Sequence, residues 1–327
     1  MSPLVDWRST LFNQKHPTDA WAAIFAAVSD SVVQAGDGAV LERSLTAGDN
    51  LLSQAAWDLW VDYPGHAPMM VQDLRDWWNA RSGSFGKAVL LLDALSVREM
   101  RTLLLAATSR GIQPAGARVR GAQVPTDTEA TAHALGLGQR SQLKSSGYTA
   151  SFAFASSSPY TDVPEGMEFG QIAEHIPAAR DVLLWCPWPD ELIHLQASYQ
   201  AGPGSITKTA TTVLGGEGFW GLVERLRQGR ELLIASDHGY AISQQFVNVE
   251  GPLADTLKAA FKGQRCGKAP GSTFSMLGEQ PMYREIGDRA SVIGPWKWKV
   301  EGGFPHLGHG GLTLGEVCVP FLVFPAL

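Results

Sequence analysis

Residues 231–240 read ELLIASDHGY, and this stretch decides the fold. Its apolar run, residues 232–235, has the continuous hydrophobic character of a strand that is buried on both faces. The run ends in Ser236-Asp237-His238, which places Asp237 and His238 at the carboxyl end of the predicted strand, where open α/β sheets have their ligand crevice. Gly239 then allows the backbone to turn tightly. The stretch therefore predicts a core strand that carries a carboxylate and an imidazole into a candidate site.

Two other apolar runs share this design. Residues 87–93 read KAVLLLD and end in Asp93. Residues 180–186 read RDVLLWC, and Asp190 and His194 come soon after the run. Because Asp190 and His194 are four residues apart, we expect both side chains on one face of a helical turn, where they can reach one ion. Acids and histidines at the ends of several strands predict one shared site.

Helical and extended patterns alternate along the rest of the chain. Apolar side chains recur at helical spacing over residues 97–104, 218–226 and 253–261. Further strands are expected over residues 117–124 and 317–324, with short extended pieces between 281 and 300. A glycine-rich loop, HLGHGG, holds His309 shortly before the last strand. The alternation predicts an α/β fold with a mostly parallel sheet sandwiched by helices.

The opening part of the chain has a different character. It is rich in tryptophan, and its apolar residues predict a packed helical layer. Three helices are expected, over residues 18–36, 48–62 and 69–81, the second of them stopped by Pro64-Gly65. Ser82-Gly83-Ser84 is typical of a connection between units. We therefore expect an N-terminal helical segment, residues 1–84, and a core, residues 85–327.

Composition limits the classes of function. The chain has 327 residues, 45% hydrophobic and 18% charged, which is ordinary for a globular protein with a large core. A net charge of −6 argues against broad electrostatic binding of duplex nucleic acid. The three cysteines are widely spaced without a CxxC, which disfavours a disulfide framework and a cysteine-rich zinc site. No signal-like start and no run of transmembrane length are present, so a soluble cytoplasmic protein is expected.

The residue types at the strand ends suit divalent metal ions. Carboxylate oxygen and imidazole nitrogen are ordinary ligands of zinc and manganese. Two such ions roughly 4 Å apart can hold the attacking and leaving oxygens of an in-line displacement at phosphorus. Three aspartates and three histidines are available for this role: Asp93, Asp190, Asp237, His194, His238 and His309. The sequence therefore predicts a two-metal site, with zinc favoured and manganese as the alternative.

A threonine at the start of a helix completes this set. Residues 125–129 read PTDTE and open the helix that follows the 117–124 strand. Thr126 and Glu129 have the spacing of a capping box, which predicts Thr126 as the N-cap. The amide groups and dipole of a helix start favour a phosphate, and a metal ion can activate a hydroxyl there.

The motifs, taken in order, resemble the alkaline phosphatase superfamily. They are a PTxT turn, an Asp and a His separated by three residues after a proline, SDHG, and HGG. The particular forms LLLDAL, PTDTEATAHALG, LIASDHGYA and HGGLTLGEVCVPFLVF look most like its PglZ domain branch, over roughly residues 85–327. Phosphodiesterase relatives carry an asparagine a little after the nucleophile, whereas the nearby position here is Thr131.

The resemblance implies roles for the candidate residues. It implies one metal held by Asp93, Asp237 and His238 together with the nucleophile, and a second held by Asp190, His194 and His309. It implies Thr128 as the nucleophile, which would form a phosphothreonine that water hydrolyses; Thr126 is the alternative. Glu316 would either orient a metal-bound histidine from behind or form an ion pair at the surface.

The function implied by the resemblance is that of a metal-dependent phosphoryl hydrolase. The PTxT turn favours a phosphodiester, with a nucleotide or oligonucleotide as substrate. PglZ domains also occur in bacterial phage-defence systems and signalling proteins, which implies protein partners. A second hypothesis is a binding or scaffold component of such a complex with little turnover, in which the helical opening is the docking surface. A phosphomutase is a weaker alternative.

Overall fold

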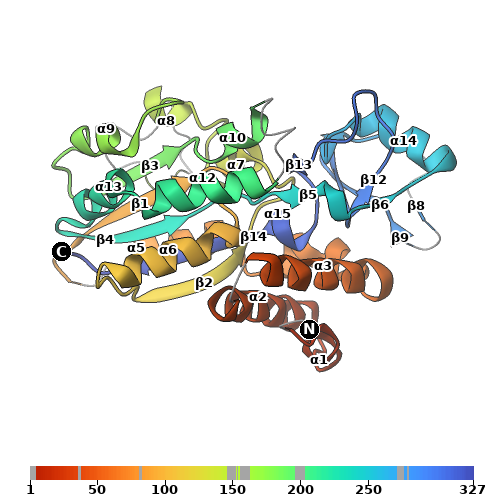
Figure 1. Cartoon of the computed structure of the whole chain (residues 1–327), viewed down its shortest axis with the longest axis horizontal. Coiled ribbons are helices and arrows are strands. Elements are labelled where there is room, and N and C mark those ends of the chain that lie inside the picture. Colours follow the sequence, from red (N-terminus) through yellow and green to blue (C-terminus); the bar gives the residue numbers. More distant parts are fainter. Residues whose placement is uncertain are drawn as a thin grey trace.

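The computed structural model describes residues 5–35, 38–80, 83–145, 152, 154, 163–195, 203–270, 276–277 and 280–327. A five-stranded sheet forms its centre, in the order β2-β14-β4-β1-β3, with helices on both faces (Figure 1). The strands are β1 Gly86–Leu92, β2 Gly116–Gly121, β3 Val182–Cys186, β4 Arg230–Ala235 and β14 Cys318–Phe324. These correspond to the predicted strands, except that β2 ends before Val124, and they confirm the predicted α/β fold.

The sheet is mostly parallel with one reversed strand. β1 pairs in parallel with both β3 and β4, whereas β14 pairs antiparallel with β4 and with β2. β14 runs antiparallel to β4 because the chain leaves β4 at its carboxyl end and enters β14 at that same edge of the sheet. There the Gly239 amide donates to the Glu316 carbonyl (2.8 Å). The reversed strand therefore brings the HGG loop to the edge where Asp237 lies.

Hydrophobic contacts on both faces explain the apolar strands. Every residue of β1 is buried, and its side chains alternate between two hydrophobic clusters. One face packs against α5 Met70–Asn79 and α7 Thr128–Leu135. The other packs against α2 Pro17–Gln34, α6 Val97–Ser109, α9 Phe169–Glu174, α12 Pro203–Gly215 and α13 Glu217–Arg227. Because these strands are buried on both faces, their sequences do not alternate between apolar and polar residues.

The N-terminal helices differ from the prediction at one place. Instead of one helix over residues 48–62, the chain forms α3 Gly38–Ala55 and α4 Asp58–His66. Pro64 lies inside α4 and does not end the helix before it. Trp60 and Tyr63 of α4 pack against Trp21, with ring centroids 4.9 and 4.8 Å away, so buried aromatic contacts hold the turn that contains the proline. The prediction of a stop at Pro64 was wrong for this reason.

The tryptophan-rich opening is a packed layer, as predicted. Trp21 and Trp60 are fully buried in the same cluster as Leu90 of β1. α1 Trp7–Phe12 completes this layer. The division at residue 84 falls in the connection between α5 and β1; Gly36, Arg81 and Ser82, which the prediction used as ends or connections, lie outside the described residues.

A smaller unit follows β4 and lies beside the sheet, on the right in Figure 1. α14 Gly251–Phe261 covers a three-stranded antiparallel sheet of β7 Cys266–Lys268, β10 Tyr283–Ile286 and β11 Arg289–Val292. Trp298 and Phe261 lie in its own hydrophobic cluster. The short extended pieces expected between 281 and 300 are confirmed. The remaining elements are α8 Gln142–Ser145, α10 Asp190–His194, α15 Leu314–Val317, β5 Ala241–Ile242, η1 Ser243–Gln245, β6 Val247–Asn248, β8 Met276–Leu277, β9 Gln280–Pro281, β12 Trp296–Lys297 and β13 Leu307–Gly308.

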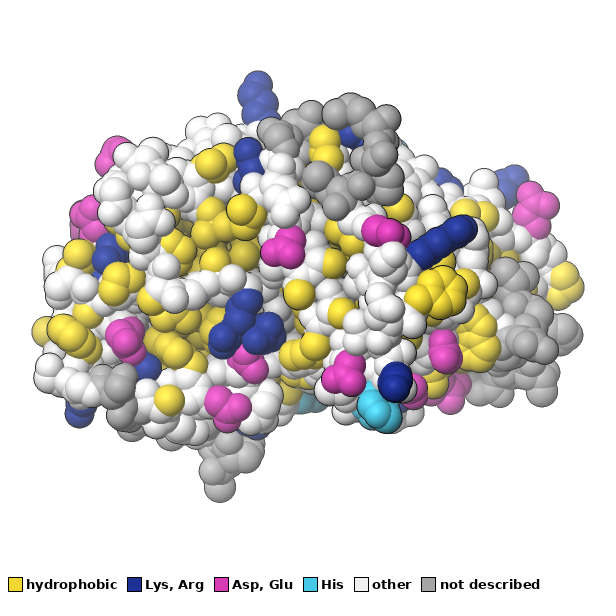
Figure 2. Space-filling model, turned by 90° about the horizontal axis from the view of Figure 1, so that it is seen from below, with side chains coloured by type: hydrophobic (Ala, Val, Ile, Leu, Met, Phe, Trp, Pro, Cys, Tyr) yellow, Lys and Arg dark blue, Asp and Glu magenta, His cyan; other side chains and the backbone are white. Residues whose placement is uncertain are grey.

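The surface and the cysteines agree with the composition. The face in Figure 2 carries lysine and arginine side chains interspersed with aspartate and glutamate. Cys186, Cys266 and Cys318 are all free thiols. Among the described helices, none combines the length and the apolar character needed to cross a bilayer.

Candidate metal centre

The ends of β1 and β4 bring three predicted ligands together. These strands are neighbours in parallel register, Leu91 opposite Ala235, so Asp93 and Asp237 emerge side by side. His238 Nε2 lies 3.4 Å from Asp93 Oδ1 and 3.8 Å from Asp237 Oδ2. All three side chains are buried. We call Asp93, Asp237 and His238 the inner cluster.

Hydrogen bonds to the backbone orient the inner cluster. Asp237 Oδ1 accepts from the amides of Ala94 and His238, both at 3.0 Å. His238 Nδ1 lies 3.0 Å from the Gly239 carbonyl, to which it can donate only if it carries the ring proton. Asp237 Oδ2 and His238 Nε2 are buried without a hydrogen-bond partner in the described parts of the chain. An unpartnered carboxylate oxygen and an unpartnered ring nitrogen fit a cation, which would take the place of any proton on that nitrogen.

Gly239 has a structural role different from the predicted one. A Cβ at this position would collide with the carbonyl oxygen of Gly315. The glycine therefore allows the two backbones to approach closely, and no left-handed turn is involved. This contact places the start of α15 against the inner cluster.

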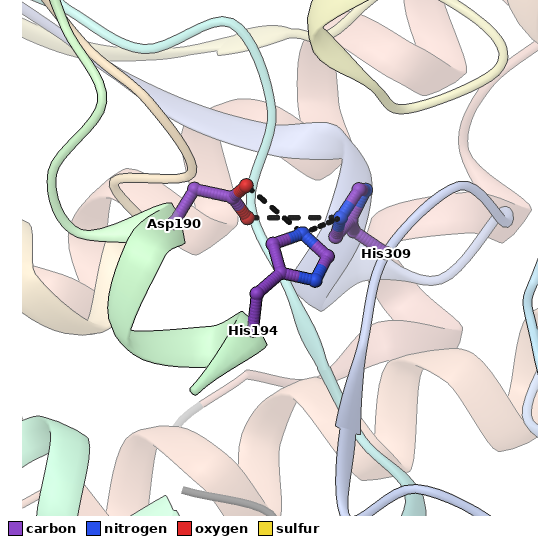
Figure 3. A group of neighbouring side chains, drawn as sticks. All are labelled: Asp190, His194 and His309. Atoms are coloured by element: carbon purple, nitrogen blue, oxygen red, sulfur yellow. Dashed lines mark hydrogen bonds and ion pairs between the residues drawn. The ribbon is translucent and has the colours of Figure 1, made fainter. Parts of the chain in front are cut away.

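A second group of predicted ligands lies beside the first. Asp190 and His194 occupy α10, and His194 Nε2 lies 3.0 Å from Asp190 Oδ2, which confirms that both point from one face of a helical turn. His309 Nε2 lies 3.2 Å from His194 Nε2 and 3.6 Å from Asp190 Oδ1 (Figure 3). Asp190 Oδ1 has no hydrogen-bond partner in the described part of the structure. We call Asp190, His194 and His309 the outer cluster.

The two clusters form one centre. The rings of His238 and His309 stack with centroids 4.4 Å apart and an interplanar angle of 21°. The Asp190 amide donates to the Asp93 carbonyl at 3.0 Å. In each cluster, three ligand atoms lie within 4.8 Å of one another. The chain thus places two three-residue candidate metal sites next to each other.

Burial and neighbouring charges shift the pKa values of both clusters. Burial, together with the nearby carboxylate of Asp93, raises the pKa of Asp237 to about 7. Burial opposes protonation of His238, but Asp237 and Asp93 outweigh it and raise the pKa of its imidazole well above the usual value. In the outer cluster, burial opposes ionisation of Asp190, yet the bond from His194 and the nearby histidines lower its pKa to about 2. Among the described residues, Arg140 contacts Asp93 and no lysine or arginine forms an ion pair with Asp237. Two buried carboxylates that share one arginine suit a divalent cation.

The loop with His309 is held by Thr126. The Thr126 hydroxyl donates to the Gly311 carbonyl and accepts from the Gly310 amide, both at 2.9 Å. The Thr126 carbonyl lies 3.2 Å from His309 Nδ1, which directs Nε2 of that ring toward the outer cluster. The predicted capping box was wrong: the N-cap of α7 is Asp127, whose carboxylate accepts from the Ala130 amide at 2.9 Å.

A buried ion pair supports the same loop from behind. Glu316 Oε1 accepts from the Gly311 amide at 2.8 Å, and Arg265 Nη2 lies 2.9 Å from Glu316 Oε2. Both side chains are buried, so the alternative of a surface ion pair was wrong. Glu316 acts on the backbone two residues after His309 and not on the ring. Arg265 comes from the smaller unit and had no sequence signal that pointed to this position.

Thr128 is the first residue of α7 and faces the inner cluster. Its Oγ1 lies 3.1 Å from both carboxylate oxygens of Asp93. Arg140 Nη1 lies 3.1 Å from Asp93 Oδ2, a contact that the sequence did not predict. Thr131, in contrast, is buried and donates to the Asp237 carbonyl at 3.2 Å, so it has a structural role.

An open cleft gives access to both clusters. It has a volume of about 1100 Å³, and its walls include Asp93, Thr128, Arg140, Asp190 and His194. A second, smaller hollow of about 270 Å³ reaches His194 and His309 from the side of the smaller unit. Thr128 and three of the candidate metal ligands, Asp93, Asp190 and His194, therefore line the same cleft.

Comparisons with known proteins find solved structures that are similar to this chain at low sequence identity. No family model matches the chain, and no curated protein matches it. Murine ectonucleotide pyrophosphatase/phosphodiesterase 5, in an inactive form bound to AMP, is 14% identical over 73% of this chain and 87% of its own, with a TM-score of 0.49. A second structure of the murine protein is 14% identical over 74% and 88%, with a TM-score of 0.48. The human protein is 10% identical over 73% and 87%, with a TM-score of 0.40.

Proposed function

We propose that this protein is a metal-dependent phosphoryl hydrolase that acts on a phosphodiester of nucleotide type. The observation that carries the proposal is the position of the Thr128 hydroxyl, 3.1 Å from both oxygens of Asp93 and beside two stacked clusters of metal-ligand type. A hydroxyl, a carboxylate and two candidate metal sites in one cleft suit phosphoryl transfer. We propose the inner and outer clusters as the ligands of two divalent ions, zinc or manganese.

In this proposal Thr128 is the nucleophile. Its hydroxyl donates to Asp93, which orients the oxygen and accepts the proton as Oγ1 bonds to phosphorus. The bond from phosphorus to the leaving oxygen breaks, and that oxygen takes a proton from water. Water then attacks phosphorus and loses a proton to solvent, the bond from phosphorus to Oγ1 breaks, and Asp93 returns its proton to Oγ1. This restores Thr128 and releases the phosphate product. Bound divalent ions would stabilise the negative charge on the attacking and leaving oxygens.

The geometry favours Thr128 over Thr126 as the nucleophile. Thr126 is fully buried, and its hydroxyl is engaged with the loop at Gly310 and Gly311. Thr128 lines the open cleft. The proposal also includes a nucleotide-type substrate, a place in the PglZ branch of the alkaline phosphatase superfamily, and defence or signalling partners, all on the strength of the sequence motifs. It includes a cytoplasmic location because the three cysteines are widely spaced and form no CxxC, which fits a reducing compartment.

The test is hydrolysis of a chromogenic phosphodiester and its monoester, with zinc or manganese added. We expect metal-dependent cleavage, faster for the diester, and a loss of about 10⁴-fold or more in Thr128→Ala, as for removal of other covalent nucleophiles. Thr128→Ser keeps the hydroxyl and should retain part of the rate. Thr126→Ser keeps the contact to Gly311 and serves as the matched control.

Two outcomes would contradict the proposal. A wild-type rate in Thr128→Ala would exclude this hydroxyl as the nucleophile. Absence of turnover in the metal-loaded protein on a panel of diesters and monoesters would favour a scaffold, which loss of partner binding on deletion of residues 1–84 would then support.

A further inference from the structure

Arg140 reaches the cleft because the chain reverses after α7. Gly136 ends that helix in the left-handed conformation, with φ of 94°. Two residues later the Gly138 amide donates to the side chain of Gln142 at 2.6 Å, which closes the turn before α8. Leu143 is buried in the core and anchors this segment. The reversal returns Arg140 to the end of α7 at which Thr128 lies.

Arg140 and Thr128 contact the same carboxylate oxygen. Arg140 Nη1 and Thr128 Oγ1 each lie 3.1 Å from Asp93 Oδ2. The Arg140 side chain is 20% exposed and opens to the cleft. A phosphoryl group on the threonine oxygen would therefore lie within reach of the guanidinium. A planar guanidinium can donate two parallel hydrogen bonds to phosphate oxygens, which makes arginine suited to this contact.

Most of the charged side chains that line the cleft are acidic. Among the described residues that line it, Arg140 is the only lysine or arginine. The acidic side chains there are Asp93, Glu129, Glu165, Asp190 and Glu191. A phosphate anion would be repelled by these carboxylates, so the cleft needs cations near Thr128. Arg140 is the cation that the chain itself supplies.

We propose that Arg140 binds the non-bridging oxygens of the phosphoryl group that Thr128 attacks. This inference rests on the proposed function. Arg140 would then lie between the Asp93 carboxylate and the phosphoryl group, and its positive charge would offset part of the negative charge that gathers around Thr128.

The first test measures binding of inorganic phosphate to the zinc-loaded protein by calorimetry. Arg140→Ala should weaken binding about 10- to 100-fold, as expected for loss of a charge-assisted hydrogen bond. Arg140→Lys, which keeps the charge but not the fork, should recover part of the loss. Ser141→Ala, on the same loop and in the same cleft, should bind phosphate like the wild type. Equal phosphate affinity in Arg140→Ala and the wild type would overturn the proposal.

The second test measures hydrolysis by Arg140→Ala, to separate the phosphate contact from the proposed function. The first test requires no turnover. If phosphate binding depends on Arg140 and nothing is hydrolysed, the proposed function fails and the phosphate contact stands; if hydrolysis proceeds equally in Arg140→Ala, the contact fails and the proposed function stands.

Discussion

The inner and outer clusters differ in how the chain holds them. Asp237 and His238 are fully buried at the ends of core strands, and backbone amides fix the Asp237 carboxylate. The outer cluster rests on a five-residue helix and a glycine-rich loop, and the His194 side chain is 60% exposed. The inner cluster is therefore part of the sheet, whereas the outer cluster depends on contacts between segments that lie far apart in the sequence.

This difference predicts an order of metal binding. The inner cluster combines two carboxylates and one imidazole in a buried site, and the outer combines one carboxylate and two imidazoles beside solvent. More negative charge and less water favour the inner cluster for the first ion. The outer cluster should bind the second ion, with an affinity that depends on its supporting loop.

Among the changes that compare the two clusters, the largest effect should come from Asp237→Asn. Loss of a buried anionic ligand should abolish binding of the first ion and lower hydrolysis by about 10³-fold or more, since a metal ion contributes several kcal/mol to this type of reaction. His194→Ala should remove only the second ion and retain one zinc per chain. Metal content after dialysis, with a parallel rate assay, measures both variants. Retention of two zinc ions in Asp237→Asn, or loss of both in His194→Ala, would contradict the order.

An intermediate effect should come from Thr126→Val. This change keeps the size of the side chain but removes the hydroxyl that bonds to Gly310 and Gly311. We expect a 10- to 100-fold loss of affinity for the second zinc ion, the range typical of residues that orient metal ligands, and little change for the first. Thr126→Ser keeps the hydroxyl and serves as control in a zinc titration. An equal loss of affinity for both zinc ions would show that Thr126 supports both clusters and not the outer cluster alone.

The last prediction concerns stability and not metal binding, at the contact between α3 and the start of α15. Asp49 Oδ1 accepts from the Leu314 amide at 2.7 Å, and burial raises the pKa of Asp49 to about 8. A raised pKa means that the folded state holds a proton that the unfolded chain releases. The contribution of Asp49 to the free energy of unfolding should therefore be largest at and below about pH 4 and fall as pH rises to about 8, by up to about 1.4 kcal/mol per pH unit.

Asp49→Asn should lack this part of the pH dependence. Urea unfolding of the metal-free protein at pH 5, 6.5 and 8 would compare the two chains. We expect the wild type to lose stability relative to the variant as pH rises. A constant difference across the three pH values would show that Asp49 does not titrate in this range.

The two clusters also differ in how far their positions could be predicted from the sequence. Asp93 directly follows one apolar run, and Asp237 and His238 lie within three positions of the end of another, so their convergence follows from the strand pattern and the parallel register. His309 was placed only by its motif, because no local pattern links residue 309 to residue 190. The helix boundary at Pro64 failed because buried aromatic contacts outweighed a local helix-stop signal.

The contacts that support the two clusters join residues that no local sequence pattern connects. Thr126 has the spacing of an N-cap, but its hydroxyl bonds 185 positions away to the Gly311 carbonyl, and Asp127 caps the helix instead. Arg140 lies in the turn after α7, yet its guanidinium contacts the carboxylate of Asp93, 47 positions earlier. Sequence spacing describes neighbours along one element, and these contacts arise only when elements pack.

By itself, the sequence determined the α/β fold and the residues at the ends of its core strands, because continuous burial requires continuous apolar runs and polar groups must lie where the strands stop. The tertiary structure alone decided that β14 runs in reverse, that the His238 and His309 rings stack, and that Thr128 and Arg140 meet at one oxygen of Asp93. These features depend on the return path of the chain and on packing between distant segments, for which local propensity contains no information.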